Sequence, residues 1–86
     1  MTVIVICEEC HGDIGIAKDF EHAIDFLIHK DWLNNFTDIY KDGEWRAVKD
    51  IFGSGWERII KNMNIDSFNE SFEDRFLLGE VKVYGT

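Results

Sequence analysis

The sequence of 86 residues contains no proline, only two cysteines and only nine basic residues. It also lacks low-complexity tracts and repeats, so we expect the whole chain to be folded. Two cysteines only three positions apart make a poor disulfide framework, because small secreted scaffolds spread several pairs through the chain. No apolar run approaches the length of a membrane span, and residues 2–6 are too few for a signal-peptide core. We therefore expect one cytoplasmic domain over residues 1–86.

The charge of the chain is strongly unbalanced. Seventeen acidic residues against nine basic ones give a formal net charge of −8. A surface of this sign is repelled by phosphate backbones and by anionic membranes, so neither nucleic acid nor a membrane is an expected partner. A protein partner of this chain should instead be basic.

Local patterns predict an α+β fold. The β-branched residues 2–6 and the segment 14–17 form a hairpin, and Asp19 is the N-cap of a helix that runs to about Lys30. Further segments are strands 37–40 and 44–48 across an Asp-Gly turn, a short turn at 48–52, helices that begin at the capping boxes 54–57 and 67–70, and a closing strand 76–84. We therefore predict a small single domain. Its antiparallel sheet is built from the N-terminal hairpin, the second strand pair and the C-terminal strand, packed against two to four short helices.

The most specific chemical pattern is Cys7-Glu8-Glu9-Cys10, in the turn of the first hairpin. A tight hairpin can place two thiolates on one zinc ion, and a structural zinc site needs two further ligands. The nearest downstream histidines are His22 and His29, which gives the spacing C-x2-C-x11-H-x6-H. We predict a structural zinc ion with these four residues as its ligands.

This order of thiolates in a hairpin and imidazoles on a helix resembles zinc fingers of the ββα type, over the segment from Cys7 to His29. It departs from them in the histidine gap, because seven helical steps separate the two imidazoles by about 10 Å. Either the helix is kinked, or one histidine binds, and we favour His29 because the helix climbs back toward the hairpin turn. Other residues could then complete the set, namely His11, Asp13, Asp25 or Asp31.

Other interpretations of the Cys-x-x-Cys-His segment remain to be compared. The simplest alternative is that the two thiols are free and the three histidines face solvent without binding a metal. Short motifs of this kind often match a sequence by chance. A c-type haem would require export and an axial partner, and nothing in the sequence signals export. A thioredoxin-like redox pair would need the first cysteine at a helix N-terminus, whereas a strand follows here.

Acidic residues gather in the C-terminal third of the chain. Glu70, Glu73 and Asp74 are the residues that we expect to contact a partner. Together with Asp66, and with Glu8 and Glu9 of the hairpin turn, they could mimic DNA, whereas the simpler alternative is a solvated helix face that keeps the protein soluble. Trp45 could point outward as an interface anchor or inward to the core. No nucleophile elbow is present, and the segment 53–55 lacks the lysine of a phosphate-binding loop. We therefore do not expect an enzyme.

The chain is similar in general character to small phage-encoded proteins, and among them to the type II-A anti-CRISPR inhibitors of Cas9. The segment that carries this resemblance is the hairpin VIVICEECHGDIGIA, residues 3–17. The resemblance implies a monomer in the cytoplasm of a bacterial host that carries a structural zinc ion. Such a protein binds Cas9, or Cas9 with its guide RNA, and blocks DNA binding or cleavage. Cas9 holds its heteroduplex in a positively charged channel, which an acidic protein could cover.

Two other functions remain as alternatives. The first is a zinc-stabilised acidic adaptor that binds a replication or transcription protein of the host. The second is a metal-dependent hydrolase, although the sequence gives no argument for an open coordination position on the metal.

Overall fold

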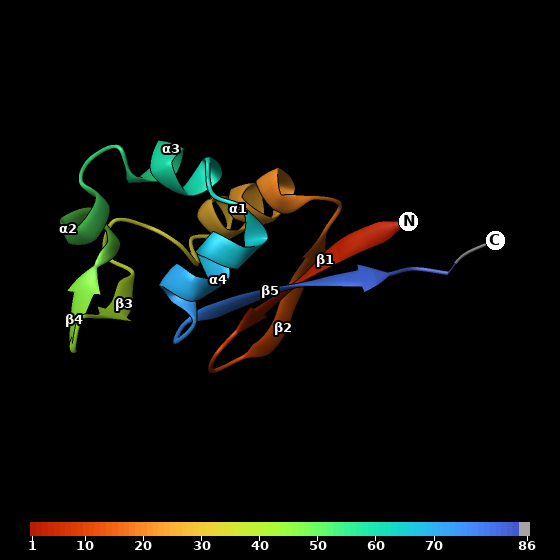
Figure 1. The fold of residues 1–86 in the computed structure, drawn as a ribbon, viewed down its shortest axis with the longest axis horizontal. Helices are drawn as coiled ribbons and strands as arrows, with labels where there is room; N and C mark the ends of the chain where they lie inside the picture. Colours follow the sequence, from red (N-terminus) through yellow and green to blue (C-terminus); the bar gives the residue numbers. More distant parts are fainter. Residues whose placement is uncertain (85–86) are drawn as a thin grey trace.

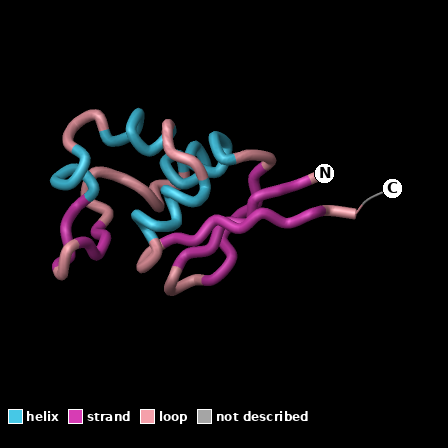
Figure 2. Tube along the Cα trace, in the orientation of Figure 1, coloured by secondary structure: helices cyan, strands magenta, loops and turns pink. Residues whose placement is uncertain are grey.

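The computed structural model describes residues 1–84 and contains two antiparallel sheets and four helices (Figures 1 and 2). The elements in chain order are β1 (Thr2–Glu8), β2 (Gly12–Ala17), α1 (Phe20–His29), β3 (Asp38–Lys41), β4 (Glu44–Ala47), α2 (Val48–Phe52), α3 (Trp56–Lys61), α4 (Ile65–Phe72) and β5 (Phe76–Lys82). The predicted α+β class, with its two strand pairs and closing strand, is confirmed.

The larger sheet has the strand order β2-β1-β5, so the first strand lies between the second and the last. Ile4 is paired with Ala17 on one side and with Glu80 on the other. The β1–β2 register shifts between Ile6 and Cys7, which marks a bulge just before the hairpin turn. The C-terminal strand therefore closes the sheet against the N-terminal strand.

The second strand pair forms a sheet of its own, in which β3 is paired only with β4. Asp42 and Gly43 connect the two strands, and both have positive φ, of 53° and 87°. Two consecutive left-handed residues are what a tight hairpin turn of this kind requires, and Asp-Gly is a favoured pair for it. The predicted turn is therefore confirmed.

The helix starts differ in how well they were predicted. Asp19 caps α1 as expected, because its side chain accepts a hydrogen bond from the His22 amide. The capping box predicted at 54–57 is wrong, since α3 begins after Gly55 without a side-chain cap. The one predicted at 67–70 is also wrong, because Asn64 caps α4 and Ser67 is the third helical residue of that capping box. Asn64 is an equally good N-cap, and starting there extends the amphipathic helix by one turn.

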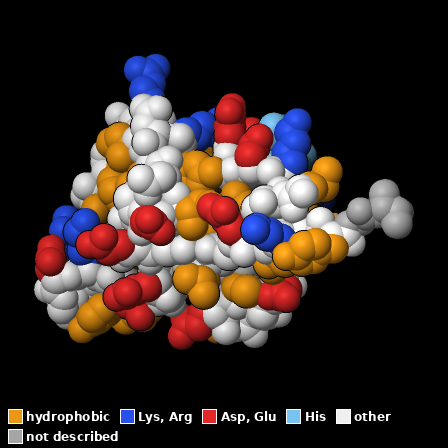
Figure 3. All heavy atoms as spheres, turned by 45° about the vertical axis from the view of Figure 1, so that its right-hand side comes forward, with side chains coloured by type: hydrophobic (Ala, Val, Ile, Leu, Met, Phe, Trp, Pro, Cys, Tyr) orange, Lys and Arg blue, Asp and Glu red, His pale blue; other side chains and the backbone are white. Residues whose placement is uncertain are grey.

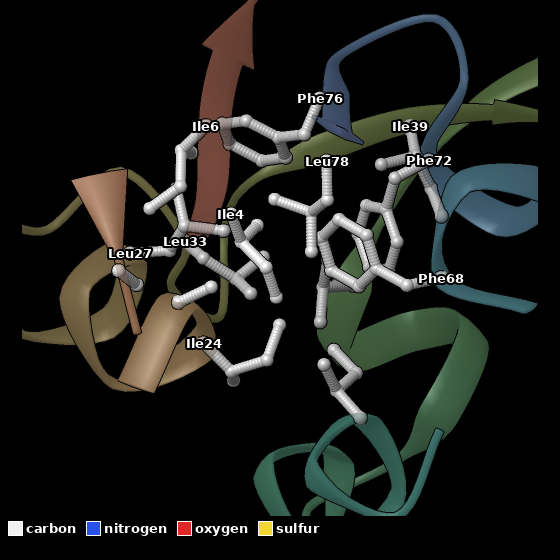
Figure 4. Packing of buried hydrophobic residues seen from close by; sticks show 14 of the residues in the cluster. Ile4, Ile6, Ile24, Leu27, Leu33, Ile39, Phe68, Phe72, Phe76 and Leu78 are labelled. Carbon is white, nitrogen blue, oxygen red and sulfur yellow. The ribbon is translucent and has the colours of Figure 1, made fainter. Parts of the chain in front are cut away.

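The core lies between the helices and one face of the three-stranded sheet (Figures 1 and 4). Phe68 and Phe72 stack with ring centroids 4.6 Å apart, and the Phe76 ring lies against both. Ile39 of the smaller sheet belongs to the same cluster of buried residues, so both sheets share one core. In residues 1–84, no helix is long and apolar enough to cross a membrane.

Candidate functional site

The turn between β1 and β2 is organised by a buried carboxylate. Glu8 ends β1 and is only 4% exposed. Its Oε1 accepts hydrogen bonds from the backbone N–H groups of Cys10, at 2.9 Å, and His11, at 3.0 Å. Ile4, Ile6 and Glu8 alternate toward the core, so the strand period itself carries this carboxylate inward. This role of Glu8 was not predicted from the sequence, although its alternation with Ile4 and Ile6 along the strand indicated that its side chain points inward.

The side chains of His11 and Arg75 also lie beside the Glu8 carboxylate. The His11 Nδ1 lies 2.6 Å from Glu8 Oε1, and the Arg75 Nε lies 3.7 Å from Glu8 Oε2. Burial raises the pKa of the Glu8 carboxyl. The hydrogen bonds from the His11 ring and the Cys10 amide, together with the charge of His11, outweigh burial and hold that pKa below its usual value. The turn is thus held around an ionised carboxylate.

The two cysteines have different environments. The Cys7 thiol donates a hydrogen bond to Asp13 Oδ1 at 2.7 Å, whereas Cys10 is exposed in the turn. This hydrogen bond, burial and the negative charge of Asp13 all raise the pKa of Cys7, so Cys7 is held as a thiol. Zinc binds the thiolate form, so a metal ion at Cys7 would have to displace the proton that the thiol donates to Asp13.

The two histidines predicted as zinc ligands lie on α1, away from the hairpin turn. His22 and His29 both line a groove of about 450 Å³ between α1 and β2. The His22 Nδ1 is also 2.7 Å from Asp19 Oδ1. The chain after α1 does return to the hairpin turn as expected, but the ring that contacts His11 there is Trp32, at a centroid distance of 5.0 Å.

The structure therefore does not gather the predicted zinc ligands. Over residues 1–84, no three His, Cys, Asp or Glu side chains are arranged to hold one metal ion. In this arrangement Cys7, Cys10, His22 and His29 do not fit a tetrahedral zinc site. Zinc binding stays a prediction, which metal analysis can test.

The predicted acidic contact residues are at the surface, and one of them, Glu73, lies near the hairpin turn. Glu70 is on α4, and Glu73 and Asp74 follow that helix; all three are exposed. Glu73 lines a cleft of about 270 Å³ together with Cys7 and Glu9. The fold thus brings an acidic residue of the C-terminal third beside the hairpin turn, which local sequence could not show.

Several large apolar side chains are also exposed. The helices cover one face of the three-stranded sheet, and the other face, which we call the open face, carries side chains from all three strands. They are the exposed Ile16, Leu77 and Val81 and the half-buried Val3 and Val5. The Ile16 side chain is 69% exposed, and Leu77 is 54% exposed. In Figure 3, hydrophobic side chains reach the surface with acidic side chains between them.

The tryptophans divide between the core and the surface. Trp56 is buried, whereas Trp45 is 55% exposed and its ring meets Tyr40 edge-on at 5.5 Å. The choice left open for Trp45 is thereby decided in favour of an outward position. The β3–β4 hairpin thus presents a pair of aromatic rings to solvent.

Comparison with protein-family models, with curated proteins and with solved structures finds no match to this chain.

Proposed function

We propose that this chain acts by stoichiometric binding to a basic protein rather than by catalysis. The observation that carries the proposal is the open face, where apolar side chains lie exposed on a chain of net charge −8. Apolar groups surrounded by charge of one sign are typical of surfaces that dock onto a partner of the opposite sign. The acidic residues Glu70, Glu73 and Asp74 would strengthen the attraction to such a partner.

The specific form of this proposal is inhibition of a type II-A Cas9 in the cytoplasm of a bacterial host. The supporting argument is electrostatic, because an acidic protein is steered toward the positively charged channel that holds the heteroduplex. The chain would block DNA binding or cleavage by obstruction, as a monomer and without cutting any substrate. The structural zinc ion that the sequence predicts stays a separate proposal, because Cys7, Cys10, His22 and His29 are not brought together in this arrangement and would have to move to bind one ion.

The deciding experiment is cleavage of target DNA by several type II-A Cas9 orthologues with a molar excess of this protein. We expect inhibition of at least one orthologue and a complex on size exclusion. The inhibition should weaken as salt rises, because charges separated by more than about 8–10 Å are screened at physiological ionic strength. Uninhibited cleavage by every orthologue, with no complex formed, would refute the Cas9 proposal.

Charge reversal tests the contact residues within this assay. Replacing Glu70, Glu73 and Asp74 with lysine should slow association with the partner and leave the melting temperature nearly unchanged, because exposed charges contribute little to folding. Glu21→Lys, at an exposed acidic residue on α1, is the control for one reversed charge and is compared with Glu70→Lys alone, so that both variants change the net charge equally. An equal effect of both reversals would assign the attraction to net charge alone.

The adaptor alternative can be tested in the same way. Capture of a replication or transcription protein by this chain, with no effect on Cas9, would support the adaptor function.

A further inference from the structure

The three-stranded sheet has two outer edges, and they differ in the hydrogen-bond partners of their outward-facing backbone groups. The edge of β5 is covered at Leu78 by Asn69 of α4. The Asn69 Nδ2 donates to the Leu78 carbonyl at 2.8 Å, and the Leu78 N–H donates to Asn69 Oδ1, also at 2.8 Å. One amide side chain thus binds both outward backbone groups of Leu78, as an additional strand would. Covering an edge in this way prevents other chains from pairing with it.

The opposite edge, on β2, has no such cover. Backbone groups along an antiparallel strand point alternately toward each neighbour. The backbone N–H and C=O of Leu78 point outward, away from its β1 partner Ile6. The backbone groups of Ile6 must therefore point the other way, toward β2, where they bind Gly15. The next residue, Ile16, therefore directs its N–H and C=O to the outer edge. No hydrogen bond from elsewhere in residues 1–84 reaches the backbone of β2 beyond its pairing with β1.

A groove lies beside this free edge. It is the groove of about 450 Å³ between β2 and α1, and its wall is formed by Ile16, Phe26 and the two histidines of α1. Gly15 allows the helix to approach, because a Cβ added there would lie 2.6 Å from the tip of the Phe26 ring. Side chains of an added strand would therefore enter the groove on one side and extend the open face on the other.

We propose that β2 is a docking edge, on which an extended segment of a basic partner protein adds as a fourth strand. This proposal rests on the proposed function and names the surface that performs it. Main-chain hydrogen bonds to a sheet edge give affinity, and alternate side chains give specificity. The exposed carboxylate of Asp13 lies near the start of β2, and those of Asp19 and Asp25 lie beyond its end and in the groove, where they outnumber the one lysine, Lys18. The segment that fits is thus apolar at its centre and basic at its ends.

A second copy of this chain is a poorer occupant of the edge. Two chains of net charge −8 repel each other, and the same carboxylates would be brought together at both ends of a β2–β2 pair. A basic segment instead finds attraction at both ends. Sedimentation at high protein concentration should therefore show a monomer.

The experiment uses a synthetic peptide of alternating threonine and valine between two pairs of lysines. It is titrated into the full chain and followed by amide hydrogen exchange and chemical shifts. We expect shifts along β2, slower exchange of the Ile16 amide and no change at Leu78. The same peptide with glutamates in place of lysines should bind more weakly. No binding of the lysine peptide up to its solubility limit, or slowed exchange on β5 instead of β2, would overturn the proposal.

Two variants locate the contact. Ile16→Pro removes the outward N–H, and proline is tolerated on an edge strand where that group faces solvent, so peptide binding should fall about tenfold. Should that variant fail to fold, Ile16→Lys keeps the N–H but removes the exposed apolar side chain and repels the basic peptide, and it too should weaken binding. Ile59→Lys is the matched control, because Ile59 is an exposed isoleucine on α3 outside both sheets, and this variant should bind as the wild type does. Equal binding by all variants would overturn the proposal.

The outcomes separate this inference from the function on which it rests. If the chain inhibits Cas9 or captures a basic protein, and Ile16→Pro and Ile16→Lys do so equally well, the binding function stands and the β2 edge is refuted. If the peptide pairs with β2 but no basic protein partner is found, the edge is competent and the proposed function fails.

Discussion

The buried carboxylate of Glu8 gives the sharpest test of how the hairpin turn is held. In Glu8→Ala, the amides of Cys10 and His11 lose their acceptor, and the half-exposed Arg75 loses its nearest negative charge. Hydrogen bonds to a charged group contribute about 1.5–3 kcal/mol each, but water can replace the acceptor in a surface turn. Loss of a helix cap costs about 1 kcal/mol, and breaking a fully buried ion pair costs about 3–5 kcal/mol. The cost of removing the Glu8 carboxylate should lie between these two values.

We therefore expect Glu8→Ala to lower the free energy of unfolding by about 2–3 kcal/mol. For a domain of this size, that corresponds to a fall of about 10–20 °C in melting temperature. Circular dichroism during thermal unfolding measures it, with Glu9→Ala as the control because Glu9 is the exposed neighbour. Glu8→Gln keeps an accepting oxygen and should cost about half as much.

The same carboxylate predicts a pH dependence. The pKa of Glu8 in the folded protein lies below its usual value of 4.5. A lowered pKa contributes stability that is fully present above pH 4.5 and is lost as pH falls through the lower folded value. The stability difference between wild type and Glu8→Gln should therefore be constant near pH 7 and shrink below pH 4.5. Unfolding of Glu8→Ala at the same temperature as Glu9→Ala would refute this account of the turn.

Three further predictions concern the thiols and the core. The zinc site that the sequence predicts would give about one zinc per chain in protein purified without chelators, and Cys10→Ser would remove it; zinc-free wild-type protein by metal analysis would refute the site. The raised pKa of Cys7 predicts that iodoacetamide alkylates Cys10 first at pH 8, and that Asp13→Asn speeds alkylation of Cys7; mass spectrometry of digested protein reads both. Phe68→Ala should cost about 3–5 kcal/mol in denaturant unfolding, whereas Phe36→Ala, at an 80% exposed position, should cost less than about 0.5 kcal/mol.

Local chemistry in the sequence determined most of the secondary structure. Asp19 starts α1 because its side chain accepts a hydrogen bond from the free His22 amide in the first turn, and Asp42-Gly43 turns the β3–β4 hairpin because both residues adopt positive φ. These effects act within four residues of the chain, so periodicity and capping are sufficient to predict them. Where two caps competed, as Asn64 and Ser67 do at α4, local chemistry did not choose between them.

Contacts between distant segments were decided only by the tertiary structure. The pairing of β5 with β1 buries Glu8 opposite Phe76 and brings Arg75 to its carboxylate, which no spacing along the chain indicates. The same pairing leaves β2 as a free edge while Asn69 covers β5. Helical spacing predicted that the end of α1 lies near the hairpin turn. In the packed structure, however, the Trp32 ring contacts His11 of that turn, whereas His29 lines the groove beside β2. Strand order and side-chain packing depend on the whole core, so they become fixed only when the chain folds.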